Sequence, residues 1–134
     1  MKVIVERDLS TATCGDIAIT AAEGGIGYWS VIDSYQWKRW QADPLDDSAG
    51  NAEVDEDFVF YTLREMDGDD RETGLGRGYD ITPQLIRRGI QLFLTGAGDF
   101  EGRPFDDMED WGMMDSDEAD CVVQLGCFGE LVYG

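Results

Sequence analysis

Carboxylates offer the most chemistry in this chain, and they gather in two segments. The first segment holds Asp43, Asp46, Asp47, Glu53, Asp55, Glu56 and Asp57. The second holds Asp99, Glu101, Asp106, Asp107, Glu109, Asp110, Asp115, Asp117, Glu118 and Asp120. Carboxylates clustered on one face repel one another and attract a basic partner.

Trp111 lies inside the second segment, where an aromatic side chain among carboxylates is typical of an interface anchor. We therefore expect a partner-binding surface formed by Asp106, Asp107, Glu109, Asp110, Trp111 and Asp115. The alternatives are a merely solvated acidic surface and a Trp111 that packs onto the core.

The net charge of −19 on 134 residues is well beyond the magnitude of about 2–8 that is comfortable for a small domain. A compact domain of this length is roughly 36 Å wide by size scaling, and a duplex of that length carries about 21 phosphates. The charge therefore approaches that of the DNA that the protein could replace. A second explanation is compositional, because coding bias and salt adaptation also produce acidic proteins with little lysine.

Two further sites could bind a small anionic ligand. The string Glu23-Gly24-Gly25-Ile26-Gly27-Tyr28-Trp29 combines glycines with an acceptor and an aromatic ring. Because a helix is expected to stop there, we expect Gly24 or Gly25 to have positive φ. Arg77, Arg87 and Arg88 form the one basic island. The candidate ligand-binding residues are therefore Glu23, Gly24, Gly25, Tyr28, Arg77, Arg87 and Arg88. A structural helix-to-strand turn and internal ion pairs are the alternatives.

Catalytic and metal chemistry find little support in the sequence. The chain has no histidine, and its three cysteines, Cys14, Cys121 and Cys127, lack the spacing of a zinc site. The carboxylates of Asp67–Glu72 are dense, but they do not follow the calcium-loop spacing of an EF-hand. No nucleophile motif is present. We expect no cofactor, no metal, free thiols and no enzyme activity.

The glycine string, preceded by Ala18-Ile19-Thr20-Ala21-Ala22, resembles small proteins of bacteriophages and high-GC bacteria that carry a T-A-x-E-G-G-x-x-Y-W motif. The C-terminal block from Asp120 to Gly134 is similar to the ends of those proteins. The family has no assigned activity. The resemblance implies a mobile-element context, in which small acidic proteins often inhibit host nucleases as anti-CRISPR or anti-restriction DNA mimics.

The expected elements are read from hydrophobic periodicity and capping residues. Helices are expected after Ser10 or Thr11, after Thr82-Pro83, and after Asp115, whose side chain would form a capping box with Glu118. Strands are expected at Val3–Val5, Tyr28–Trp40, Phe58–Leu63 and Leu131–Tyr133. In the second strand, Trp29, Val31, Tyr35 and Trp37 would share one face. The third is apolar on both faces and is expected to be central.

These elements predict one α+β domain over residues 1–134, a small antiparallel sheet with about three helices packed on one side. The N-terminal residues carry no apolar signal segment and no run is long enough to span a membrane, so we expect a cytoplasmic protein. The leading functional hypothesis is a non-enzymatic, phage-type inhibitor of a basic, nucleic-acid-binding host defence protein. It would be a monomer or small homo-oligomer that does not itself bind nucleic acid. The alternatives are a nucleotide-sequestering protein and an acidic housekeeping domain.

Overall fold

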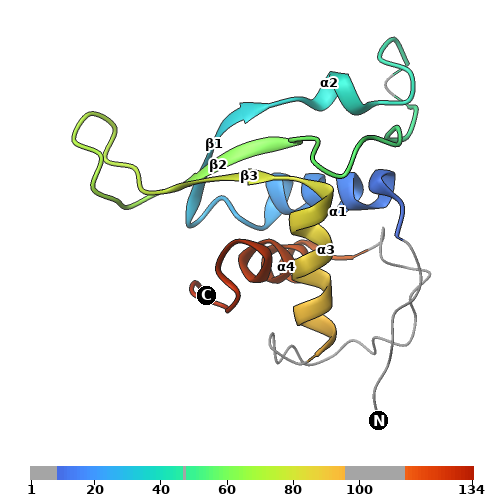
Figure 1. Ribbon diagram of the computed structural model, residues 1–134. Coiled ribbons are helices and arrows are strands. Elements are labelled where there is room, and N and C mark those ends of the chain that lie inside the picture. Colours follow the sequence, from blue (N-terminus) through green and yellow to red (C-terminus); the bar gives the residue numbers. More distant parts are fainter. Residues whose placement is uncertain (1–8, 47, 96–113) are drawn as a thin grey trace.

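A three-stranded antiparallel sheet lies against three helices in the computed structural model, which describes residues 9–46, 48–95 and 114–134 (Figure 1). The strands are β1 (Ser30–Tyr35), β2 (Tyr61–Glu65) and β3 (Gly78–Ile81), with β2 in the centre. The helices on one side of the sheet are α1 (Thr11–Gly24), α3 (Pro83–Leu94) and α4 (Ser116–Phe128). A single helical turn, α2 (Trp37–Trp40), follows β1. The expected α+β class and its arrangement of helices are confirmed.

The three longer helices begin at the predicted capping residues. Ser10 accepts a hydrogen bond from the backbone N–H of Thr13, and Thr82 accepts one from that of Leu85. Asp115 and Glu118 form the predicted capping box. α4 ends at Gly129, whose left-handed backbone with φ 76° is typical of a helix C-terminus.

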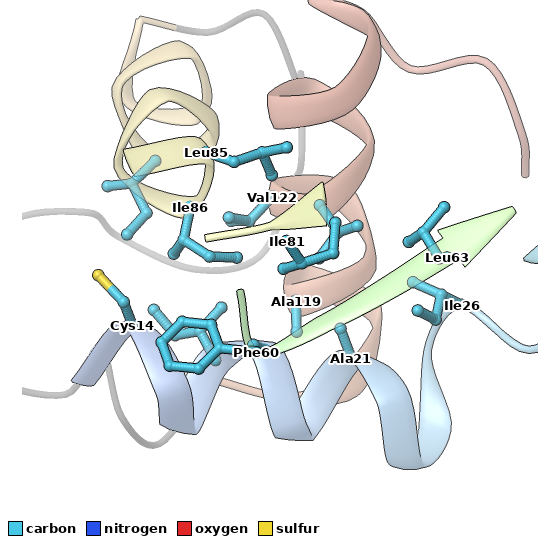
Figure 2. Packing of buried hydrophobic residues seen from close by; sticks show 14 of the residues in the cluster. Cys14, Ala21, Ile26, Phe60, Leu63, Ile81, Leu85, Ile86, Ala119 and Val122 are labelled. Carbon is cyan, nitrogen blue, oxygen red and sulfur yellow. The ribbon is translucent and has the colours of Figure 1, made fainter. Parts of the chain in front are cut away.

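The hydrophobic core fills the space between the sheet and the helices. Figure 2 shows Cys14 and Ala21 of α1 facing side chains of the sheet and of the two other helices. Each of the three helices buries one apolar stripe: Cys14, Ile17, Ala18 and Ala21 on α1; Leu85, Ile86, Ile90 and Phe93 on α3; Ala119, Val122, Val123 and Gly126 on α4. This core fixes the three helices relative to the sheet, so surface residues on them have defined positions.

The prediction of one long strand over Tyr28–Trp40 is wrong, both in the length of the strand and in which side chains share one of its faces. β1 ends at Tyr35, and an irregularity in the β1–β2 pairing between Ile32 and Ser34 interrupts the alternation of faces. Trp29 is buried, whereas Val31 and Tyr35 are exposed, so these side chains do not share a face. The chain then turns into α2, which places Trp40 in the core.

The other strands differ from prediction in their bounds. β2 begins later than expected, at Tyr61, although its central position is confirmed. β3, which begins directly after Arg77, was not predicted. The segment Leu131–Tyr133 forms no strand. The strand expected at Val3–Val5 lies outside the described residues.

Candidate functional site

The glycine string and the C-terminal block meet at one buried carboxylate. Asp120 of α4 is 7% exposed and accepts hydrogen bonds from Trp29 Nε1 at 2.8 Å and from the Tyr28 hydroxyl at 2.7 Å. The side-chain amide of Gln124, one turn later, donates to the same carboxylate at 3.0 Å. We call Tyr28, Trp29, Asp120 and Gln124 the Asp120 cluster. It joins the α1–β1 turn to α4.

Gln124 also holds the C-terminal segment in place. Its Oε1 accepts from the backbone N–H groups of Val132 and Tyr133, at 2.9 and 2.8 Å. The Tyr133 ring stacks on Trp29 with centroids 5.0 Å apart, and its hydroxyl donates to Glu65 at 2.7 Å.

The hydrogen bond to Glu65, with some burial, raises the pKa of Tyr133 to about 12. Burial and the Asp120 hydrogen bond raise that of Tyr28 to about 12. Both hydroxyls are therefore proton donors in structural contacts and not general bases.

The glycine turn serves packing in this structure, and the predicted positive φ is wrong. Gly25 has φ −112°, and the glycines of positive φ in the described ranges are Gly74, Gly129 and Gly134. A Cβ on Gly25 would lie 2.5 Å from the Ser116 carbonyl oxygen. The residue is glycine because α4 begins against it, not because the backbone is left-handed.

The predicted ligand-binding residues therefore do not form an open cradle. Gly24 and Gly25 pack against Ser116, and the Tyr28 hydroxyl is engaged by Asp120, while Glu23 is exposed. The alternative of a structural helix-to-strand turn agrees with this geometry.

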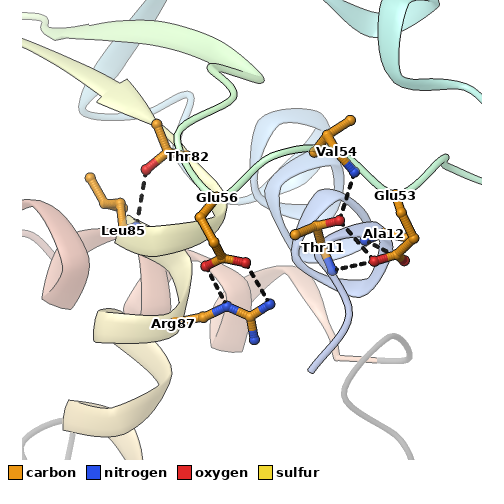
Figure 3. Close-up of polar contacts among 8 residues, drawn as sticks. All are labelled: Thr11, Ala12, Glu53, Val54, Glu56, Thr82, Leu85 and Arg87. Carbon is orange, nitrogen blue, oxygen red and sulfur yellow. Dashed lines mark hydrogen bonds and ion pairs between the residues drawn. The ribbon is translucent and has the colours of Figure 1, made fainter. Parts of the chain in front are cut away.

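The three arginines of the basic island are engaged by different partners. Arg87 makes a two-point contact with Glu56, at 2.8 and 2.9 Å (Figure 3). Arg88 donates to the carbonyl oxygen of Gly126 near the end of α4. Arg77 lies over the Tyr79 ring, 5.0 Å from its centroid. Neighbouring helix residues point about 100° apart, so Arg87 and Arg88 diverge and do not converge on one anion.

The first acidic segment contains carboxylates with structural roles. Glu53 accepts hydrogen bonds from the backbone of Thr11 and Ala12 and from the Thr11 hydroxyl at the start of α1 (Figure 3). Burial opposes its ionisation, but the hydrogen bonds together lower the pKa of Glu53. Glu56 is the partner of Arg87. Asp55 and Asp57, in contrast, are exposed and have no side-chain hydrogen bond or ion pair within the described part of the chain.

The second acidic segment is described only from Met114 onward. Asp115 is exposed, and its side chain also has a structural role as the N-cap of α4. Asp117 is exposed, whereas Glu118 and Asp120 are buried. The other predicted partner-binding residues, Asp106, Asp107, Glu109, Asp110 and Trp111, lie outside the described residues.

The carboxylates of Asp67–Glu72 belong to the β2–β3 connection, beside a cavity of about 480 Å³ that also has Arg64 and Arg77 in its wall. Asp70 accepts hydrogen bonds from the backbone of Thr73 and Glu72 and from Arg64, and these lower its pKa. The Asp70 carboxylate therefore stabilises the β2–β3 connection through these hydrogen bonds. In the portion that the structure describes, no group of three or more metal-ligating side chains comes together.

A second, smaller pocket of about 250 Å³ was missed by sequence reasoning. It lies between α1 and the loop after α2, and it is lined by Asp16, Ile19, Thr20, Trp37, Ala49, Gly50 and Asn51. Burial raises the pKa of Asp16, although a hydrogen bond from Asn51 opposes the shift. The helical spacing of Asp16, Ile19 and Thr20 could have indicated a shared face. The loop residues that complete the pocket carry no such signal.

The three cysteines are free thiols, as expected. Burial raises the pKa of Cys14 and Cys121 to about 11 and that of Cys127 to about 12. Such thiols are poor nucleophiles.

No protein-family model, curated protein or solved structure matches this chain. None of the helices within the described residues is long and apolar enough to cross a membrane.

Proposed function

We propose that this chain is a binding protein that captures a basic, nucleic-acid-binding host protein through its acidic surface. The observation that carries the proposal is the position of the carboxylates. Of the acidic residues that the structure describes, Glu118 and Asp120 alone are buried. Exposed carboxylates without cationic neighbours repel one another, and a basic groove would convert that repulsion into attraction.

The available carboxylates are spread over several elements. Asp33 lies on β1, Asp55 and Asp57 precede β2, and Asp67 and Asp69 follow it, all at exposed positions. With a net charge of −19, such a surface favours fast and salt-sensitive association with a cationic protein. In the phage-type context implied by the resemblance, the partner is a host defence protein in the cytoplasm, and this chain blocks its nucleic-acid site.

The test is capture followed by competition. The chain is immobilised, a lysate of a high-GC bacterium is passed over it, and bound proteins are eluted with salt. A captured protein is then purified and its binding to duplex DNA is measured with and without the chain. The proposal predicts a nucleic-acid-binding protein whose DNA is displaced competitively. Captured proteins that bind no nucleic acid, or that keep their DNA in the presence of the chain, would contradict it.

Charge reversal tests the predicted contact segment. Replacing Asp106, Asp107, Glu109 and Asp110 with lysine should weaken binding to the captured protein and flatten its salt dependence. The matched control is the same reversal at Asp33, Asp67, Asp69 and Glu72, on and beside the sheet. Equal losses from the two reversals would show that general charge, and not the segment around Trp111, drives binding.

The nucleotide-sequestering alternative has less support from the geometry, because Arg87 and Arg88 are engaged by Glu56 and Gly126. It is tested by thermal shift against a nucleotide panel. A nucleotide at about a hundred times its dissociation constant stabilises its binding protein by about 2.7 kcal/mol. A clear shift with one nucleotide would favour this alternative over the acidic-surface proposal.

A further inference from the structure

The pocket between α1 and the loop after α2 has a wall on each side. Asp16, Ile19 and Thr20 lie at helical spacing on one face of α1. Asn51 and its two preceding residues form the opposite wall, and Trp37 of α2 closes one side. The volume of about 250 Å³ is large enough for a side chain or a small molecule, but not for a folded segment.

The polar atoms that this pocket leaves available are hydrogen-bond acceptors. Asn51 Nδ2 donates to Asp16 Oδ1 at 2.6 Å, which fixes the orientation of the Asn51 amide. Asn51 Oδ1 is buried and has no donor within the described residues. The Thr20 hydroxyl proton is used by the Asp16 carbonyl oxygen at 2.9 Å. Because Asn51 Oδ1 is closed off from solvent, the acceptors that the pocket presents to an incoming group are the second oxygen of Asp16 and the hydroxyl oxygen of Thr20.

Further unsatisfied groups lie next to Asn51. Gln41, which forms a β-bridge with Asn51, is 3% exposed, and neither atom of its amide has a partner in the described structure. Buried polar atoms usually have a partner, but Gln41 does not line the pocket, and Trp40 Nε1, also buried without a partner, is a donor like the Gln41 amide nitrogen, so these groups do not set the charge of a ligand.

Trp37 adds an aromatic wall. Its ring meets Trp40 edge to face, with centroids 5.5 Å apart and planes at 89°, and Trp40 is fully buried. This contact anchors Trp37 on the core while it lines the pocket. An indole face is the best aromatic surface for a cation.

We propose that the pocket formed by Asp16, Trp37 and Asn51 binds the guanidinium group of an arginine side chain. A cationic donor fits the Asp16 carboxylate, whose second oxygen has no donor among the described residues, and no lysine or arginine of those residues lines the pocket. The planar guanidinium can donate to Asp16 and stack on Trp37 at once, which a lysine ammonium cannot do as well. That the arginine belongs to the captured basic protein rests on the proposed function. The raised pKa of Asp16 agrees with a partly desolvated charge that a cation would stabilise.

The pocket is tested with N-acetyl-L-arginine amide, followed through the indole N–H resonance of Trp37 in NMR spectra. Trp37→Phe assigns that resonance. The arginine probe should shift it saturably, and the lysine analogue and the uncharged citrulline analogue should bind at least about tenfold more weakly. Asp16→Asn should weaken arginine binding by at least about tenfold. Asp33→Asn, which removes the same charge from exposed β1, should change it less than about twofold.

A second variant and a second probe guard against local misfolding. Trp37→Leu removes the reporter resonance, so binding to this variant is measured by isothermal titration calorimetry; the substitution leaves the Asp16–Asn51 hydrogen bond in place and should abolish the preference for arginine. Oligoarginine should bind more tightly than oligolysine of equal length, although a general acidic surface would not distinguish them.

The outcomes separate this pocket from the proposed function. If arginine and lysine probes bind alike and Asp16→Asn behaves like Asp33→Asn, the pocket proposal is overturned, even where a basic protein is captured. If the arginine probe binds through Asp16 and Trp37 but no nucleic-acid-binding protein is captured, the pocket proposal stands and the proposed function fails.

Discussion

Replacing Asp120 with alanine should destabilise the fold far more than replacing any exposed carboxylate. The substitution removes the acceptor for Trp29 Nε1, and Trp29 is 2% exposed, so its N–H cannot turn to water. An unsatisfied buried donor costs about 1–3 kcal/mol, and the lost charge-assisted hydrogen bonds add to it. Gln124 keeps the Tyr133 carbonyl as an acceptor, and Tyr28 is half exposed, so their losses are smaller. Removing a buried charge also returns some desolvation energy.

We therefore expect Asp120→Ala to lower the free energy of unfolding by about 2–4 kcal/mol, a large share of the roughly 5–15 kcal/mol of a typical domain. Urea denaturation followed by tryptophan fluorescence measures it. Asp117→Ala is the matched control, because it removes the same charge from an exposed position in the first turn of α4. That control should cost no more than about 1 kcal/mol, through the helix dipole.

A double-mutant cycle with Trp29→Phe identifies the contact responsible. The two substitutions should couple by at least about 1 kcal/mol, because each removes one side of the same hydrogen bond. A loss for Asp120→Ala close to that of Asp117→Ala, or a coupling energy near zero, would refute the argument that this carboxylate joins the α1–β1 turn to α4.

Glu53→Gln should lower the unfolding free energy by about 0.5–1 kcal/mol at pH 7. Because the folded pKa of Glu53 is lowered, this contribution is present above the unfolded pKa and is lost as the pH falls through the folded one, so the gap to wild type should close in acid denaturation curves. Gly25→Ala should destabilise by about 1–3 kcal/mol through its clash with the Ser116 carbonyl, whereas Gly27→Ala, with nothing within 4 Å, should leave the urea midpoint almost unchanged. The raised pKa values of Cys14, Cys121 and Cys127 should make alkylation by iodoacetamide at pH 8 about a hundredfold slower in the folded than in the unfolded protein; equal rates, measured by mass spectrometry, would contradict this.

Local signals in the sequence predicted the helices well and the strands less well. Ser10, Thr82 and Asp115 each act through a hydrogen bond within three residues, so the helix starts could be recognised without knowledge of the rest of the chain. The prediction of one long strand over Tyr28–Trp40 failed because the facing of β1 depends on an irregularity in its pairing with β2. It also depends on the contact of Trp29 with Asp120, 91 residues away. β3 is short and carries glycine, so its ladder with β2 and not its composition defines it.

The candidate sites show the same limit. The sequence predicted a positive φ at Gly24 or Gly25 and a ligand contact for Tyr28, whereas the contacts of Gly25 and Tyr28 in the structure are with Ser116 and Asp120, far along the chain. Sequence reasoning grouped Glu53 and Glu56 with their acidic neighbours, although both are engaged by distant groups at Thr11 and Arg87. The pocket at Asp16 and Asn51 depends on another such long-range contact: helical spacing marks the wall on α1, but the loop residues that complete it carry no sequence signal.

This division of the carboxylates leads to a last prediction, on salt. Asp120, Glu53 and Glu56 stabilise the fold through close contacts, whereas exposed groups such as Asp33 and Asp57 only add repulsion. Salt screens exposed charges over about 10 Å at 0.1 M and buried contacts much less. The melting temperature should therefore rise with sodium chloride, and affinity for the captured basic protein should fall over the same range. An acidic housekeeping domain would show the first effect and have no partner for the second, so binding that is insensitive to salt would remove the main support for the acidic-surface proposal.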